Sequence, residues 1–591
     1  MAETLISPGV LARENDQSFI TQQPVTVGAA IVGPTVKGPV EVPTVVTSYS
    51  DYQNRFGTTF ESGSDEFSFL TSISAYNYFQ NGGESLLVAR VVSGSNTWTY
   101  SSASVYTAES ASSAYTSSFT LEALDKGVIF TNSGSTPNNS QLITGGSGSL
   151  YSGSRDNIRW EIANSSSAEG NFTLLIRRGD DNDNNKIVLE TWTDLSLDPK
   201  SNNYIAKVIG DQKFTYDSTE NYIKVEGDYR NASRYVRIKS VDSKTPDYFD
   251  NAGNAKGEYT GSIPSIGSGS HGGTFWGGVG DVISSTGANN MYDNIGDGSN
   301  KITQGLEGSD YNDMLNLLSN QDDYQFNILT TPGLLNEDHT SQITTAITNT
   351  QVRGDAIYVM DLVGYSSTIS TAVTQANSRN SSYAASYWPW LQTIDPDIEG
   401  GKRVWVPAST MIPGVYAFND NASDPWFAPA GINRGGLTTV ISPERKLSQA
   451  NRDTLYNGKV NPIATFPGTG VVVYGQKTLQ KQASALDRVN VRRLLISLKS
   501  YIGQVAQTLV FEQNTAATRN SFLSIVNPYL ESIVQRQGLY AFKVVMDESN
   551  NTPDVVDRNQ MVGTIYLQPT KTAEFILLDF NVLPTGATFP S

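Results

Sequence analysis

The stretch that decides the fold first is Val25-Thr-Val-Gly-Ala-Ala-Ile-Val-Gly-Pro34. Its nearly continuous apolar run ends at a Gly-Pro pair, which is typical of a buried strand followed by a turn. Downstream, apolar residues recur at helical spacing from Phe67 to Phe79, and Asn81-Gly82-Gly83 can end a helix. We therefore expect a helix that begins near residue 65 and a strand at 85–92. Strand, helix and strand in this order indicate an α/β unit.

The composition changes sharply at Ser93. Of the 62 residues from Ser93 to Ser154, 17 are serine and only Lys126 is basic. We interpret 93–154 as a Ser-rich β insertion with a strand at 118–123. Residues 155–299 are predicted to be a second β-rich insertion, with strands at 158–163, 172–177, 186–192 and 204–209.

Helix–strand alternation resumes after residue 308. Helices are expected at 311–318 and 339–349, and strands at 326–330 and 356–362, the second with Asp361 near its end. The pattern predicts an α/β middle domain made of residues 25–92 and 300–445, interrupted by the two insertions.

Residues 446–591, the predicted C-terminal domain, have the clearest pattern. Ser484-Ala-Leu-Asp487 fits a capping box, and an apolar stripe continues from Leu494 to Leu509. We expect a helix at 485–511, a second at 515–535 kinked by Pro528, and strands at 540–546, 560–568 and 573–582. The predicted fold class is α+β and multidomain: a core of N- and C-terminal segments, inserted β-rich domains and extended terminal arms.

The composition excludes several kinds of site. The chain of 591 residues has no cysteine, so it can form no disulfide and no cysteine-ligated metal site. Its two histidines, His271 and His339, lie in loop-like sequence, and we expect both on the surface. No pair of carboxylates is singled out by spacing. We predict no catalytic residue, metal or cofactor, and we expect that the protein is not an enzyme.

The net charge and the apolar runs exclude two classes of partner. A net charge of -17 argues against nucleic acid, whose phosphates require a basic surface. The longest apolar runs are only as long as a strand, so no membrane partner is expected. The N-terminal sequence lacks a signal-peptide pattern, from which we expect a protein made and kept in a cytoplasm.

Two short motifs in the second insertion have a functional and a structural interpretation. Arg178-Gly179-Asp180 spells an adhesion tripeptide, which we interpret as coincidence. The acidic run 180–183 resembles the start of a calcium loop. Lys186 stands where such a loop that began at Asp181 would need glycine, so a hairpin turn is the expectation.

A basic edge is predicted on the helix at 485–511. Residues 488–511 include no acidic side chain, and Arg488, Arg492 and Lys499 would lie within roughly 40° of one another around the helix axis. One interpretation is an ordinary solvated face with internal salt bridges. The other is a docking edge for an acidic partner, with salt-sensitive binding.

The two ends of the chain are candidates for strand exchange between subunits. Residues 1–24 form a strand-like segment without a local partner, and a strand followed by a short tail ends the chain. Unpaired strands of this kind can join the sheets of neighbouring chains. The alternative is frayed tails. The candidate arm residues are Val10, Phe19, Ile20, Phe575, Ile576, Leu577 and Leu578.

A series of short motifs runs through the chain in a fixed order. They are Ser7-Pro8-Gly9-Val10, Val32-Gly33-Pro34, Phe79-Gln-Asn-Gly-Gly83, Val88-Ala-Arg-Val91, Trp388-Pro-Trp390, Pro413-Gly-Val-Tyr-Ala417, Trp426-Phe-Ala-Pro-Ala-Gly431 and a block from Asn461 to Pro569. Through these motifs the chain resembles the contractile tail sheath proteins of bacteriophages (myovirus-type) and related contractile injection systems. The resemblance covers residues 1–92 and 300–591 but not the Ser-rich part at 93–154.

The resemblance implies a structural subunit. Sheath subunits stack as six-fold rings around a tail tube and contract to drive it through a target envelope. By analogy, the partners are other copies of the chain, the tail tube protein, and baseplate and tail terminator proteins. The implied location is a virion tail assembled in the host cytoplasm, with the helix at 485–511 facing the tube. The alternative is a secreted or surface β-rich adhesin, which the Ser/Gly/Asn composition and the tripeptide favour.

Overall fold

The computed structural model describes residues 27–62, 65–106, 117–132, 148–150, 152–270, 272–280, 302–304 and 306–574. Its centre is an eight-stranded sheet in which six neighbouring strands, from β5 to β22, are parallel. Antiparallel β2 and β23 form the two edges. In spatial order the strands are β2 Thr44–Val46, β5 Leu86–Arg90, β1 Val27–Gly33, β16 Phe326–Leu335, β17 Ile357–Asp361, β18 Ala384–Trp388, β22 Asn461–Phe466 and β23 Gly470–Val473.

Both faces of this sheet are covered, as a mainly parallel sheet requires. Successive residues of β1 point to opposite sides, so Ala29 and Ile31 join one core cluster and Ala30 and Val32 the other. Helices α1 Tyr49–Phe56, α2 Leu70–Gln80 and α8 Ile412–Ala422 contribute to the first cluster. Helices α5 Asn312–Leu317, α6 Thr340–Arg353, α7 Ile369–Asn377 and α9 Gln449–Asn457 contribute to the second.

The predicted strands of the sheet are confirmed, but the start of one helix differs. The helix expected from residue 65 begins at Leu70, because residues 65–68 form β4 and pair with β3 Thr59–Ser62. The predicted boundary at 445/446 falls before β22 and β23, which the structure adds to the same sheet as β1 and β16.

The two predicted insertions form one β-rich unit. It contains two three-stranded sheets, β13-β7-β6 and β10-β9-β8, and side chains of both sheets share a single core. β7, from the predicted Ser-rich insertion, pairs with β13, from the predicted second insertion, with Ala123 opposite Val236. The run at 204–209 forms helix α3 and not a strand. The bounds are β6 Tyr100–Tyr106, β7 Ser117–Lys126, β8 Ile158–Ser166, β9 Asn171–Arg178, β10 Val188–Ser196, α3 Ile205–Ile209, β13 Val236–Val241 and α4 Gly257–Thr260.

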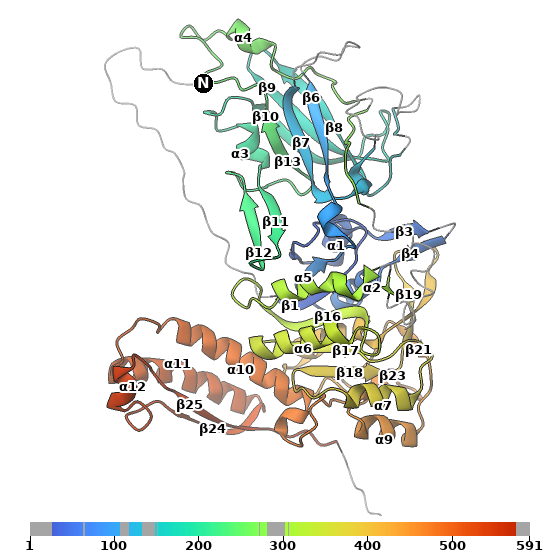
Figure 1. The fold of residues 1–591 in the computed structure, drawn as a ribbon, viewed down its shortest axis with the longest axis vertical. Helices are drawn as coiled ribbons and strands as arrows, with labels where there is room; N and C mark the ends of the chain where they lie inside the picture. The colour runs from blue at the N-terminus through green and yellow to red at the C-terminus, as the bar shows by residue number, and fades with distance from the viewer. Residues whose placement is uncertain are drawn as a thin grey trace, which may run out of the picture.

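A hairpin connects this β-rich unit to the central sheet. Its strands are β11 Lys213–Asp217 and β12 Tyr222–Glu226. Figure 1 shows the hairpin extending from the upper unit towards α5, and Tyr216 and Ile223 pack against the core cluster on that side of the sheet. The insertion therefore contacts the central unit through this hairpin, in addition to the two chain connections that link it to the sheet.

The C-terminal region is a pair of helices beside a hairpin. It comprises α10 Val489–Gln507, α11 Ala516–Gln535, β24 Leu539–Val545, α12 Pro553–Asp557 and β25 Thr564–Pro569, around a core of its own. Both predicted helices are confirmed, and Pro528 lies inside the second. The first begins at Val489, after the 3-10 turn Ala485–Asp487 that Ser484 caps. Among the described residues no helix is long and apolar enough to span a membrane.

The remaining elements are short. A three-stranded sheet, order β20-β19-β21, lies beside the central sheet and is made of β19 Leu391–Asp395, β20 Lys402–Val406 and β21 Val440–Pro443. β14 Ile302–Thr303 pairs with β15 Leu306–Glu307 where the chain returns from the insertion.

Candidate interaction surfaces

The predicted basic edge of α10 is largely occupied by the chain itself. Arg488, at the start of α10, is half-buried and donates from Nε to Oε1 of Glu574 at 2.6 Å. Its Nη1 donates to Oδ1 of Asp487 at 2.8 Å. This residue therefore matches the interpretation with internal salt bridges.

Arg492 and Lys499 differ in their exposure. Arg492 is only 4% exposed, and its guanidinium lies 3.9 Å from the centre of the Tyr383 ring. Burial lowers the pKa of Arg492. Lys499 is exposed, and its Nζ donates to the Tyr383 hydroxyl at 2.9 Å. Of the three predicted cations, only Lys499 is an exposed residue, so the three do not form a continuous solvent-exposed basic surface.

A fourth cation, Arg493, attaches α10 to the central unit. Its side chain is 4% exposed, lies 4.5 Å from the ring centre of Tyr416 and donates from Nη2 to Oδ2 of Asp420. Tyr416 and Asp420 both belong to α8. The helical period places Arg493 about 100° from Arg492 around the helix axis, off the predicted basic edge, but nothing in the sequence identifies its partner on α8.

The hairpin β24–β25 is a two-stranded sheet whose outer edges meet no other strand in the described part of the chain. Isolated two-stranded sheets are only marginally stable, and free strand edges can take up a further strand. Two tyrosines of the hairpin are prominently exposed, Tyr540 at 66% and Tyr566 at 60%. The edges and these side chains make the hairpin a candidate surface for other chains.

The loop between α10 and α11 presents a fully exposed phenylalanine. Phe511 has a φ of 71°, a left-handed conformation that is unfavourable for a bulky side chain. Its neighbour Val510 is also exposed. An apolar pair held outward in this way is a second candidate contact.

The predicted arm residues lie outside the described residues. This applies to Val10, Phe19 and Ile20 in the N-terminal arm and to Phe575, Ile576, Leu577 and Leu578 in the C-terminal arm. The last described residue, Glu574, is therefore the point from which the C-terminal arm would continue.

The acidic run of the insertion is a structural turn. The carboxylate of Asp181 is buried and accepts from Arg177 Nε at 2.7 Å and from Arg159 Nη1 at 3.2 Å. In the adhesion tripeptide, Arg178 donates to Asp180 from Nε at 2.5 Å and from Nη2 at 3.0 Å, so the two charged ends bind each other. Within the described ranges, no group of three or more His, Asp or Glu side chains is placed to hold a metal ion.

His339 is not the surface residue that we expected. It lies directly before α6, is 4% exposed, and its Nδ1 accepts from the backbone N–H of Leu335 at 3.1 Å. His271 lies outside the described residues.

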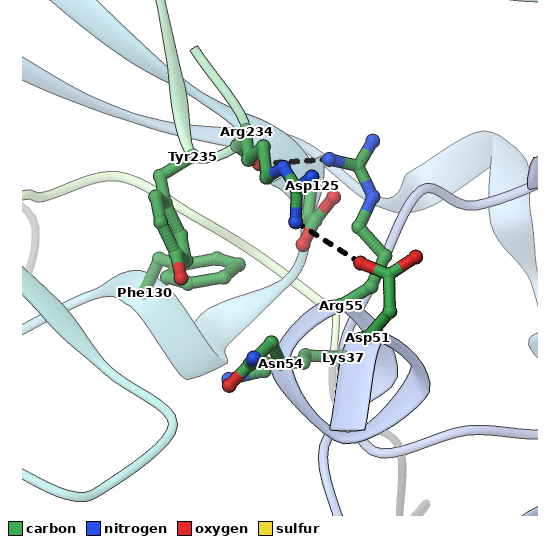
Figure 2. A pocket seen from close by; sticks show the side chains of 8 residues that line it. All are labelled: Lys37, Asp51, Asn54, Arg55, Asp125, Phe130, Arg234 and Tyr235. Carbon is green, nitrogen blue, oxygen red and sulfur yellow. Dashed lines mark hydrogen bonds and ion pairs between the residues drawn. The ribbon is translucent and has the colours of Figure 1, made fainter. Parts of the chain in front are cut away.

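An ion pair and a hydrogen bond fix the β-rich insertion to α1 of the central unit. Arg234 donates from Nη1 to Oδ1 of Asp51 at 3.0 Å, and Arg55 donates to the carbonyl of Arg234 at 2.9 Å. Figure 2 shows these side chains around a small pocket that Asp125 also lines. Burial raises the pKa of Asp125, while Arg55 and other nearby cations act to lower it. Charged side chains from both units meet at this pocket, so it lies at the joint between them.

One buried carboxylate lies at the end of β17. Oδ2 of Asp361 accepts from the Ser409 hydroxyl at 2.5 Å, and Oδ1 accepts from the Ser409 backbone N–H at 3.1 Å. Burial raises the pKa of Asp361 to about 7. These contacts attach the turn before α8 to the sheet.

Comparison with known proteins identifies the central and C-terminal parts of the chain. Residues 305–479 match the phage tail sheath protein central domain, and residues 481–582 match the phage tail sheath C-terminal domain. The tail sheath protein of Vibrio phage KVP40 is 45% identical over 185 residues, which are 31% of this chain and 28% of that protein. The tail sheath protein of Enterobacteria phage T4 is 43% identical over 185 residues, with the same two shares. The match thus spans less than a third of these relatives.

A solved structure shares the fold over most of the chain. The crystal structure of the sheath tail protein of Listeria innocua aligns with a TM-score of 0.50 over 92% of this chain and 96% of that one, at 9% identity. At this identity the likeness shows the fold alone. The chain thus carries the central and C-terminal domains of phage tail sheath proteins, at residues 305–479 and 481–582.

Proposed function

We propose that this chain is the structural subunit of a contractile tail sheath. Copies of it would polymerise as stacked hexameric rings around a tail tube and contract to drive the tube through the envelope of a target cell. The observation that carries this proposal is the pair of adjoining sheath-domain matches, which cover the central sheet from β16 onward and the C-terminal helix pair. Its place would be the virion tail, assembled in the host cytoplasm.

The free edges of β24–β25 support self-association. A strand added to one edge would form several backbone hydrogen bonds, each worth roughly 1 kcal/mol net. The arms at residues 1–24 and 575–591 of neighbouring copies are the proposed added strands. Joints repeated over several neighbours would make the polymer cooperative and keep it connected while the rings rotate and compress.

The attachment to the tube protein is proposed to be weaker and electrostatic. Lys499 is the exposed cation on the predicted face of α10, whereas Arg488 and Arg492 are held by Glu574 and Tyr383. We therefore revise the proposed tube contact: Lys499 would touch an acidic tube surface, and the two arginines would hold α10 in position. A single exposed cation suits a contact that must break on contraction.

Baseplate and tail terminator proteins are the remaining proposed partners, at the two ends of the polymer. The net charge of -17 disfavours nucleic acid as a partner. The adhesin alternative loses its most specific support, because Arg178 and Asp180 of the tripeptide bind each other.

Removal of residues 2–22 tests the arm. The shortened chain should melt at the temperature of the full chain but remain monomeric in sedimentation at concentrations where the full chain polymerises. Tubes of normal length from the shortened chain would eliminate the N-terminal arm from the proposal.

A further inference from the structure

Several donors converge on the carboxylate of Glu574. Oε1 accepts from Arg488 Nε at 2.6 Å and from Gln476 Nε2 at 3.1 Å. Oε2 accepts from Arg488 Nη2 at 3.0 Å and from the Tyr456 hydroxyl at 2.8 Å. The Glu574 side chain is 17% exposed, so a charged group this close to the chain end is largely withdrawn from water.

The donors come from three separate parts of the fold. Tyr456 belongs to α9, Gln476 follows β23, and Arg488 precedes α10. Gln476 Nε2 also donates to Thr572 Oγ1 at 2.6 Å, so two residues of the same segment are held. The segment after β25 is thus attached both to the central unit and to the first turn of the C-terminal helix pair.

The donors are themselves held in position. Lys477 Nζ donates to the carbonyl of Tyr456 at 2.8 Å and lies 3.9 Å from the centre of its ring. Arg488 is oriented by its bond to Asp487. Burial acts to raise the pKa of Glu574, but hydrogen bonds from Arg488 and Tyr456 outweigh it and leave the pKa lowered. Glu574 is therefore ionised at neutral pH. Its bidentate salt bridge with Arg488 consists of charge-assisted hydrogen bonds, which are stronger than those between neutral groups.

We propose that Glu574, Arg488, Tyr456 and Gln476 form a latch that fixes the point and direction at which the C-terminal arm leaves the subunit. This rests on the proposed function, in which the arm enters the sheet of a neighbour. A fixed departure point reduces the conformational freedom that is lost when the arm binds. It also transmits a pull on the arm to α10 and, through Gln476 and Tyr456, to the central unit. Glu574 is thus a positioning residue for the joint between subunits.

The test compares Glu574→Ala with a matched control, Glu531→Ala, on the exposed side of α11. Glu574→Ala should raise the critical concentration for polymerisation by about tenfold, because the arm is no longer preorganised. Hydrogen exchange at residues 570–574 of the monomer should become faster, while the control changes neither quantity. Arg488→Lys, which loses the two-pronged pair, should show a smaller effect of the same sign. Combining it with Glu574→Ala should add nothing to polymerisation.

Three outcomes would overturn the latch. The first is polymerisation of Glu574→Ala at the wild-type critical concentration. The second is unchanged exchange at residues 570–574, and the third is full additivity of Arg488→Lys with Glu574→Ala. A chain that ends at Ile576 separates this result from the proposed function. If that chain fails to polymerise while Glu574→Ala polymerises normally, the proposed C-terminal arm is supported and only the latch is contradicted. If that chain polymerises normally, both the C-terminal arm and the latch are contradicted.

Discussion

Arg493 on α10 donates a hydrogen bond to Asp420 on α8 at 2.5 Å, and this pair joins the C-terminal helix pair to the central unit. Arg493 is almost fully buried, whereas 23% of the Asp420 side chain remains exposed. The junction between the two family domains therefore depends on a charge that the fold has enclosed.

Arg493→Ala should lower the free energy of unfolding by about 2 kcal/mol, below the 3–5 kcal/mol of a fully buried pair because Asp420 can be partly solvated. Thermal melting of the monomer measures this. Lys499→Ala, on the same helix but exposed, should leave the melting temperature within error. Equal decreases in melting temperature for both variants would show that the Arg493–Asp420 pair contributes no more to stability than an exposed lysine on the same helix.

Lys499→Glu should weaken attachment to the tube without affecting the fold. The exposed side chain can change sign at little cost to stability, and an acidic partner surface would then repel it. Co-sedimentation of sheath with purified tube protein at low salt should fall, and added salt should reduce the difference between variant and wild type. Arg492→Glu is unsuitable for this test, because a buried carboxylate over the Tyr383 ring should unfold the region. Unchanged co-sedimentation of Lys499→Glu at every salt concentration would exclude Lys499 from the contact.

Asp361→Asn should change how stability depends on pH. The pKa of Asp361 is about 7 in the folded chain, against an ordinary value of 3.8 that applies once the chain unfolds. Between these values the folded state holds a proton that the unfolded state has released, so stability falls as pH rises from about 4 to about 7. Asparagine removes this dependence, and the variant should gain on the order of 4 kcal/mol over wild type at pH 8. The gain should vanish near pH 4.

Asp453→Asn is the control for that experiment, because Asp453 is exposed on α9. Its stability should follow wild type at each pH in chemical denaturation. A wild-type stability that is flat between pH 4 and 7 would contradict the role given to Asp361.

Phe511→Asn should separate folding from assembly. Asparagine tolerates the positive φ better than phenylalanine, so the monomer should be more stable by about 0.5–1 kcal/mol. If Phe511 contacts a neighbouring subunit, polymerisation should nevertheless weaken. Val352→Thr, which removes an exposed apolar group from α6, should leave polymerisation unchanged. Stronger or unaltered polymerisation of Phe511→Asn would remove the loop from the interface.

Local patterns in the sequence predicted the elements that show a clear helical or strand period. The alternation of helix and strand from residue 311 to residue 362 indicated α5, β16, α6 and β17 nearly within their bounds, with Asp361 ending the last strand. Apolar spacing predicted α10 and α11 equally well. These elements each show the period of their own secondary structure, so a single window of sequence is sufficient.

The failures involve contacts between distant segments. The two predicted insertions form one unit because β7 pairs with β13, more than a hundred residues away in the sequence. No local sequence pattern predicts a strand pair of such long range. The run Tyr204-Ile-Ala-Lys-Val-Ile209 is too short for its period to distinguish helix from strand. The predicted basic edge lies on the helix to which the sequence assigned it. The sequence could not show that Tyr383 and Glu574 lie against that edge and occupy its arginines.

Electron microscopy of the purified full-length chain tests the central claim most directly. The sheath account predicts that the chain, concentrated alone or with tube protein, forms hollow or cross-striated tubes with regularly stacked rings. The chain that lacks residues 2–22 should form none under the same conditions. Dispersed single particles of the full-length chain at every concentration and salt level, with and without tube protein, would contradict the account.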